Sequence, residues 1–389
     1  MFALRFAILL TALFISVTSI RGEDAPVKQQ LFNGQNLNGW HLTNCEAAVE
    51  DGRLVFKAGD GLIRTDHQYS DFVLELDWRA MKSEKYDSGI YIRCELPPAG
   101  KPFPPRNQIN LKQGDEGNLI KYPDARSSGL IKAGEWNHFK VTARGEKVEM
   151  EINGKPAWST AGFAPVSGYI ALQVEVPLGG EFEFKNITVT ELSHRPLFNG
   201  TDLTGWEGAS EDAAKCWKVE DGTIVCTGEK GPWLRSKEEF GDFNLRLEYK
   251  LKEGGNSGVF IRVPKSGNHH GKDAGIEVQT LDDAAPRYKT LKPYQFTGSL
   301  YAIAPAKERV GRPAGEWNSL EINCQGTAYR IVHNGVTIID TNAEETPALK
   351  ERLSAGFLGL QNHSEEVWYR NIRISKLDSQ PAPTGADGK

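Results

Sequence analysis

Two polar side chains share one face of an expected strand in the second half of the chain. Side chains alternate between the two faces of a strand, so Glu277 and Gln279 lie on one face of residues 276–281. His363 follows a Leu-Gln pair at the end of another expected strand. A carboxylate and an imidazole can both exchange protons near neutral pH, so these positions are candidates for acid–base chemistry.

Other charged and metal-ligating side chains accompany them. Arg262 is expected to share a face with Phe260 on the preceding strand, where a guanidinium would lie over an aromatic surface. The first half of the chain has Arg93 in the matching motif, which favours a structural ion pair. His269 and His270 are adjacent, a spacing that fits no usual zinc site, so we expect a loop and no metal.

The elements that must position these residues occur twice. Residues 31–40 recur as 197–206, with seven of ten positions identical at an offset of 166. Six shorter motifs return in the same order: 50–52 with 220–222, 88–93 with 257–262, 134–137 with 315–318, 153–154 with 334–335, 168–173 with 356–361, and 185–187 with 370–372. Such collinear self-similarity predicts two copies of one domain.

The repeat sets the expected boundaries. We predict domains over residues 28–193 and 195–377, followed by a disordered tail of Pro, Gly and Ala at 378–389. The offset between the copies grows from 169 to 181, so the second copy carries about twelve extra residues, which include 268–275. Such an insertion is expected to form a loop, and loops on rigid scaffolds often carry function.

The pattern of apolar residues predicts an all-β fold. Residues 72–79 and 243–250 alternate apolar and mostly polar side chains, which is typical of strands with one face on a core. Asp-Gly or Asn-Gly pairs at 51–52, 153–154, 221–222 and 334–335 suit two-residue hairpin turns. With about 165–180 residues per copy, two tandem jelly-roll-like β-sandwich domains fit better than immunoglobulin domains.

Charge and the N-terminus limit the cellular role. The net charge of −5, with both signs interspersed, provides no basic surface for nucleic acid. Arg5 precedes an apolar run at 6–17 and a polar stretch up to Glu23, which predicts a signal peptide over 1–23 rather than a membrane anchor. We therefore expect a secreted or periplasmic protein that is not attached to a membrane after the signal is removed.

The five cysteines leave at least one thiol unpaired within a monomer. Cys216 and Cys226 flank an expected hairpin turn and could face each other. Whether they do depends on strand register, and we favour two small apolar strand residues without a disulfide.

The ordered motifs resemble a known family. Each copy is similar to the 3-keto-disaccharide hydrolase domain, which has a concanavalin-A-like fold. The motifs that carry the resemblance are the opening repeat and, in the second copy, residues 256–262, 275–279, 297–301, 315–318, 356–363 and 369–372. The resemblance spans essentially the whole chain beyond the N-terminal segment, twice over.

The resemblance implies cleavage of glycosides that carry a ketone at C3, without a cofactor. The ketone acidifies the hydrogen on C2, so a base can remove it and the C1 aglycone can leave as a hydrolase or lyase product. On this basis Glu277 is the expected base, Arg262 the stabiliser of the enolate, and His363 the acid or orienting group. The expected substrate-binding residues are Asn256, Gln279, Asp282, Tyr301 and Gln361.

The first copy departs from the second at these positions. Gln108 aligns with Glu277, and a neutral amide cannot act as a base. Glu175 stands at the position of His363, and Asp87 stands at that of Asn256. The first copy is therefore either a binding module or a site with different chemistry, and we favour binding.

Two other carbohydrate functions are known for sandwiches of this kind. A retaining glucanase of this architecture needs a Glu-x-Asp-x-x-Glu pattern, but Ala80 stands where the second glutamate should follow Glu75 and Asp77. A lectin that binds sugars by aromatic stacking without catalysis is the stronger alternative. Turnover of a 3-keto-glycoside would separate an enzyme from a lectin.

Overall fold

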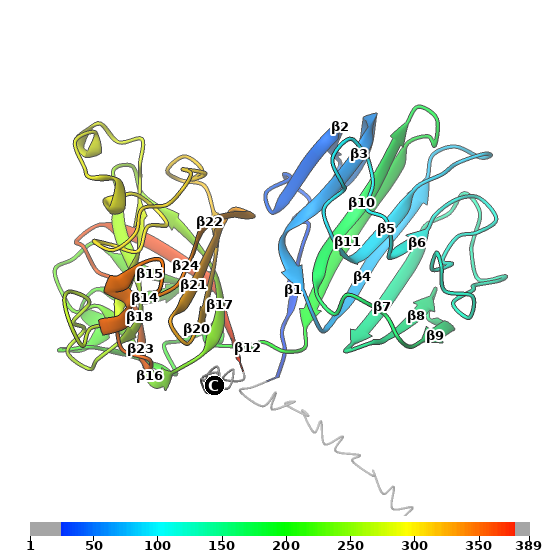
Figure 1. Cartoon of the computed structure of the whole chain (residues 1–389). Helices are drawn as coiled ribbons and strands as arrows, with labels where there is room; N and C mark the ends of the chain where they lie inside the picture. Colours follow the sequence, from blue (N-terminus) through cyan, green and yellow to red (C-terminus); the bar gives the residue numbers. More distant parts are fainter. Residues whose placement is uncertain (1–24, 378–389) are drawn as a thin grey trace, which may run out of the picture.

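The computed structural model describes residues 25–377 and consists almost wholly of β-strands, which form two β-sandwiches side by side (Figure 1). No α-helix occurs in this range, only four short 3-10 turns in the second domain. The all-β prediction is confirmed. The expected signal peptide at 1–23 and the expected tail at 378–389 lie outside the described residues.

The first domain contains eleven strands: β1 (Lys28–Gln30), β2 (Trp40–Glu50), β3 (Arg53–Tyr69), β4 (Phe72–Ala80), β5 (Gly89–Cys94), β6 (Gln108–Asn110), β7 (Asn137–Arg144), β8 (Lys147–Ile152), β9 (Lys155–Thr160), β10 (Gly168–Val176) and β11 (Phe182–Glu191). They run in the order β6-β5-β10-β3-β11-β4-β7-β8-β9, with β1 on β11 and β2 on β3. The long strand β3 pairs with both β10 and β11, and so links the two layers of the sandwich.

The second domain repeats this arrangement as two separate sheets. Its strands are β12 (Arg195–Pro196), β13 (Trp206–Gly208), β14 (Trp217–Glu220), β15 (Thr223–Thr227), β16 (Leu234–Phe240), β17 (Phe243–Leu251), β18 (Asn256–Val263), β19 (Ile276–Leu281), β20 (Asn318–Gln325), β21 (Ala328–His333), β22 (Val336–Thr341), β23 (Gly356–Leu360) and β24 (Glu366–Lys376). One sheet has the order β13-β16-β23-β18-β19, and the other β14-β15-β24-β17-β20-β21-β22 with β12 on β24. Two strands, β15 and β16, occupy the place of β3.

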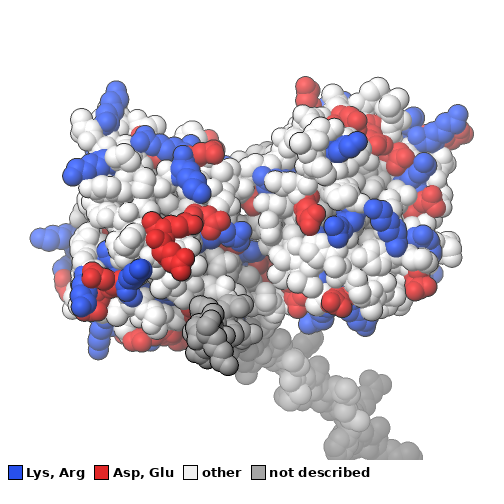
Figure 2. Space-filling model, in the orientation of Figure 1, with Lys and Arg blue, Asp and Glu red and all other residues white. Residues whose placement is uncertain are grey.

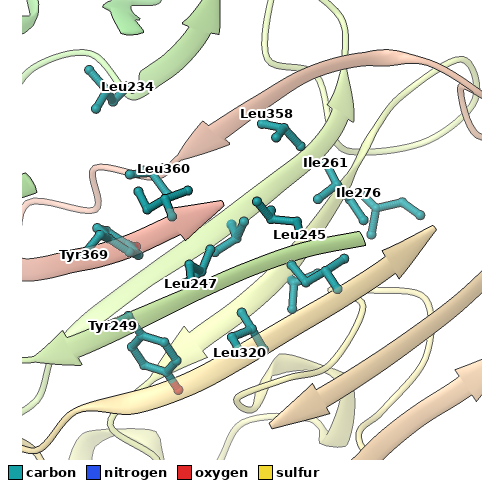
Figure 3. Close-up of a cluster of buried hydrophobic side chains, with 14 of the residues drawn as sticks. Leu234, Leu245, Leu247, Tyr249, Ile261, Ile276, Leu320, Leu358, Leu360 and Tyr369 are labelled. Carbon is teal, nitrogen blue, oxygen red and sulfur yellow. The ribbon is translucent and has the colours of Figure 1, made fainter. Parts of the chain in front are cut away.

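The core of the second domain lies between these two sheets. Leu245, Leu247 and Tyr249 of β17 meet Leu358 of β23 and Ile261 of β18 across the sandwich (Figure 3). Each of these side chains is about 99% buried or more, as expected from the period-two pattern. The same pattern fills the first domain, where Phe72, Leu74, Leu76 and Trp78 of β4 are equally buried.

Asn244 and Arg246 on the polar face of β17 are also buried, because the first domain covers this part of the strand. Arg246 bonds Glu191 at 2.7 Å and the carbonyl oxygen of Gln68 at 2.6 Å, and its Nε lies 3.3 Å from Glu321. His67 of the first domain contacts the same Glu321 at 2.9 Å. Both carboxylates are buried, and although burial by itself raises the pKa of Glu191, the charges of Arg246 and Arg373 hold it at about 2. The two domains are therefore joined by buried ion pairs.

The surface carries mixed charge, with Lys, Arg, Asp and Glu scattered over both domains on the face in Figure 2. Within residues 25–377 no helix is long and apolar enough to cross a bilayer. All five cysteines are free, so Cys216 and Cys226 form no disulfide. Cys226 pairs with Trp217 rather than with Cys216 in the hairpin register.

Candidate functional site

A cleft of about 230 Å³ opens over the five-stranded sheet of the second domain. Strands β18 and β19 form its floor, and the loops after β18, β19 and β23 form its walls. It is lined by Asn256, His269, His270, Glu277, Gln279, Leu281, Tyr288, Leu291, Gln295, Tyr301, Gln361 and His363. Six of the eight predicted site residues meet here: Asn256, Glu277 and Gln279 from strands β18 and β19, and Tyr301, Gln361 and His363 from the adjoining loops.

Glu277 is the buried carboxylate of this cleft. It lies opposite Phe260 in the pairing of β18 with β19, and only 3% of its surface is exposed. Gly258 on β18 makes room for it, since a Cβ there would overlap the Glu277 carboxylate. Burial raises the pKa of Glu277 to about 8, against a smaller opposing effect of a hydrogen bond from Gln361. The cleft lining contains no lysine or arginine to stabilise the ionised form.

His269 reaches this carboxylate from the insertion of the second copy. Its Nε2 lies 3.3 Å from Glu277 Oε2, and its ring stacks on Phe260 at 4.7 Å between centroids and an angle of 24°. The other ring nitrogen, Nδ1, lies 3.1 Å from the carbonyl oxygen of Gly267. Burial lowers the pKa of His269, so the imidazole is held in its neutral form near pH 7.

Two hydrogen-bond acceptors in the cleft lack a protein partner. Asn256 Oδ1 and Gln361 Oε1 are buried atoms that accept no hydrogen bond within the described chain. Buried polar atoms are rarely left unpaired in folded proteins. A ligand with hydroxyl groups would satisfy both atoms.

The opposite wall holds a chain of polar groups. Gln279 donates to the carbonyl oxygen of Gln295 at 3.3 Å, and Gln295 Nε2 donates to the hydroxyl of Tyr301 at 2.9 Å. Because the Tyr301 oxygen accepts this bond, its own proton can be donated into the cleft. His363 lies at the exposed rim and lines the cleft from the side of β23.

The prediction that Arg262 shares a face with Phe260 is wrong. A β-bulge between Phe260 and Val263, where Arg262 has a φ of 51°, turns the guanidinium to the other side. Arg262 there donates to Gly241 at 2.8 Å and Asp242 at 2.9 Å, and its equivalent Arg93 does the same in the first domain. Arg262 therefore leaves the site and is a structural residue.

Asp282 also lies outside the cleft lining. Its Oδ2 accepts the backbone N–H of Gly254 at 2.8 Å and so holds the turn between β17 and β18. Strand β19 ends at Leu281, so the alternation of side chains along the strand does not extend to Asp282. The expectation that Asp282 binds substrate is not supported by this placement.

Sequence reasoning missed the loop residues of the cleft. They are His269, His270, Tyr288, Leu291 and Gln295. The available signal for the histidines was the insertion at 268–275, which the repeat comparison marks as a functional loop. Within residues 25–377 no three His, Cys, Asp or Glu side chains are grouped so as to hold a metal ion.

The first domain has an amide where the second has its buried acid. Tyr91 donates to Gln108 Oε1 at 3.0 Å, and Gln108 Nε2 donates to Gln173, so both ends of the amide are engaged. A more open cleft of about 410 Å³ nearby is lined in part by Asp87 and Glu175. Burial and the charge of Asp87 raise the pKa of Glu175. This site lacks the Glu277–His269 pair.

Two similar solved structures are named for carbohydrate hydrolysis and carbohydrate binding. A proposed glycosyl hydrolase from Parabacteroides distasonis is 26% identical, with a TM-score of 0.41, over 48% of this chain and 94% of that one. A carbohydrate-binding module from Bacillus subtilis is 14% identical, with a TM-score of 0.33, over 45% and 98% of the two chains.

Similarity in sequence identifies the family more specifically than similarity in structure does. A 3-keto-disaccharide hydrolase of Bacteroides thetaiotaomicron is 27% identical over 229 residues, which cover 47% of this chain and 78% of that protein. The sequence profile of the 3-keto-alpha-glucoside-1,2-lyase-like domain matches residues 28–190 and again residues 193–375. Since these two matches span nearly the whole described chain, the protein belongs to this carbohydrate-active, glycosyl-hydrolase-like family, with one family domain in each half.

Proposed function

We propose that the second domain cleaves glycosides whose sugar ring carries a ketone at C3, with Glu277 as the base that removes the C2 proton. The ketone makes that proton acidic, and the resulting enolate expels the aglycone from C1. Water can then add to the unsaturated sugar to give the hydrolysed product. The name of the Bacteroides relative supports this class of substrate.

The buried carboxylate of Glu277 carries this proposal. A base works best when its pKa lies near the working pH, and burial without a neighbouring Lys or Arg brings Glu277 to about 8. An ordinary surface glutamate would be too weak a base for a carbon acid. We assign to Tyr301 the hydrogen bond to the developing enolate oxygen, the role first expected of Arg262, because its hydroxyl proton is free to point into the cleft.

The substrate is proposed to be an uncharged sugar. Asn256 Oδ1 and Gln361 Oε1 are acceptors that sugar hydroxyls can satisfy. The cleft lining holds no Lys or Arg, the usual partners of a carboxylate or phosphate on a sugar. We assign to His363, exposed at the rim, a contact with the aglycone.

The test is turnover of synthetic 3-keto-glucosides by the full-length protein, with product identification by NMR. Glu277→Gln is nearly isosteric, and the first domain already accommodates Gln108 beside Gly89. We expect kcat to fall by about 10²–10⁴-fold in this variant, with little change in sugar binding. Wild-type turnover in the folded variant would exclude Glu277 as the base.

A lectin-like role is the second candidate, and we propose it for the first domain. The amide of Gln108 supports a site without this cleavage chemistry, because an amide cannot accept the C2 proton. If the whole protein were a lectin, it would bind 3-keto-glucosides without consuming them. Titration calorimetry alongside the turnover assay separates the two functions.

We also propose that the protein is exported to the periplasm or the medium, because the apolar run at 6–17 is typical of a signal peptide. Mass spectrometry of the protein recovered from cell fractions tests this. Recovery of the uncleaved chain from the cytoplasm would contradict it.

A further inference from the structure

We infer that His269 protonates the departing aglycone oxygen, so that Glu277 and His269 together carry one proton from C2 of the sugar to the leaving group. This inference rests on the proposed function and names the general acid of that reaction. It replaces His363, which was expected in this role and lies instead at the exposed rim of the cleft.

The hydrogen bonds of His269 fix which nitrogen does the chemistry. Nδ1 faces the carbonyl oxygen of Gly267 at 3.1 Å, and a carbonyl can only accept, so Nδ1 carries a proton. In the neutral imidazole, Nε2 is then the bare nitrogen. Nε2 lies 3.3 Å from Glu277 Oε2, so a proton on either atom can pass to the other.

A pair that holds one proton can both accept and donate. With the proton on Nε2, Glu277 is a carboxylate and His269 an imidazolium. The C2–H bond breaks and its proton goes to Glu277, while the electron pair forms the C1–C2 double bond of the enone. The C1–O bond breaks, and the aglycone oxygen takes the proton from Nε2. The pair again holds one proton, now on Glu277, and its passage to Nε2 restores the starting form.

The fold holds His269 firmly for this task. Its ring stacks on Phe260, the residue opposite Glu277 across β18 and β19, so one aromatic surface positions both members of the pair. Arg352 donates to the carbonyl oxygens of His269 and Gly275 at 3.2 Å each and so fixes the loop. The first domain lacks both this loop and the carboxylate, which agrees with a pair that works only as a unit.

The surroundings of His269 and Glu277 favour the neutral form of the pair, with the shared proton on Glu277, so the ion-pair form that reacts is the minor one. Burial lowers its pKa, the Gly267 carbonyl raises it, and the nearby His270 and Arg352 lower it further. His270 lies 4.0 Å from it, ring to ring, and 5.8 Å from Tyr301. Glu277 is subject to burial and to its hydrogen bond from Gln361. The one-proton pair is therefore mostly neutral at rest, and it loses its proton near the pKa of Glu277.

The experiment compares leaving groups in full-length His269→Gln. A methyl aglycone needs a proton to depart, whereas a 4-nitrophenyl aglycone leaves well without one. We expect kcat/KM for methyl 3-keto-glucosides to fall about 10²-fold or more, and for nitrophenyl 3-keto-glucosides less than about tenfold. His138→Gln in the first domain, where His138 pairs with Asp77, is the matched control and should change neither rate.

The pH profile supplies a second measurement. With the methyl aglycone, wild-type kcat/KM should fall above about pH 8, as the pair loses its proton. For the His269→Gln variant on the nitrophenyl substrate, kcat/KM should instead increase with pH through the pKa of Glu277 and then stay constant.

An equal loss for both aglycones in His269→Gln, or an unchanged pH profile, would overturn the role of His269 as the acid. If wild-type protein turned over neither substrate, the proposed function itself would fail. The two failures are therefore distinguishable.

Discussion

Replacing Glu277 with glutamine should stabilise the protein at alkaline pH. The pKa of Glu277 is raised from its ordinary value of 4.5 to about 8 by burial. An acid whose pKa is raised by folding does not lower the free energy of unfolding below its unfolded pKa, because the folded and unfolded states are both protonated there. The cost grows as pH rises from 4.5 to 8, because the unfolded chain ionises and the folded one resists, and it is constant above that.

The magnitude follows from the same two values. A pKa difference of one corresponds to about 1.4 kcal/mol, so the full cost is about 5 kcal/mol above pH 8 and about 3 kcal/mol at pH 7. At pH 5 it is below about 1 kcal/mol. Glutamine fills the same space without a titrating group. For a domain of this size, each kcal/mol moves Tm by about 2–4 °C, so a cost of about 5 kcal/mol predicts that the variant melts roughly 10–20 °C higher at pH 9.

The assay is a thermal melt of wild type and Glu277→Gln at pH 5, 7 and 9, read by near-ultraviolet circular dichroism. Glu253→Gln, a change at an exposed loop residue, is the matched control and should give the same difference at every pH. A Glu277→Gln variant whose melting advantage does not grow with pH would refute the desolvated carboxylate. The raised pKa would then no longer support Glu277 as the base.

Two other changes test the structural framework. Arg262→Met should destabilise the fold by about 3–5 kcal/mol by leaving Asp242 without its cation, while kcat of the folded fraction stays at the wild-type value; a specific loss of kcat would return Arg262 to the site. Glu191→Gln should cost about 3 kcal/mol at pH 7, because the pKa of Glu191 is held at about 2 and its contribution is present above pH 4.5. Urea titrations should show that deficit vanish as pH falls from 4.5 towards 2; a deficit independent of pH would contradict the ion pair.

The sequence by itself determined the repeat, the all-β class and half of the residues that line the cleft. Strand parity is a local property, so the alternation along residues 276–281 was enough to place Glu277 and Gln279 on one face. The repeat also exposed the difference between Glu277 and Gln108. These conclusions needed no knowledge of how distant segments pack.

Tertiary structure decided everything that depends on where a chain bends or what covers a surface. A single bulged residue changes which side chains point to which face of a strand. The bulge at Arg262 therefore turns its side chain away from the cleft, although the strand itself was predicted correctly. The insertion in the second copy predicted a loop, but the position of His269 beside Glu277 depends on the packing of its ring on Phe260. The polar face of β17 reads as solvent-exposed in sequence, yet Arg246 is buried because a second domain lies against it. Local patterns encode faces of strands, whereas contacts between elements depend on the path of the whole chain.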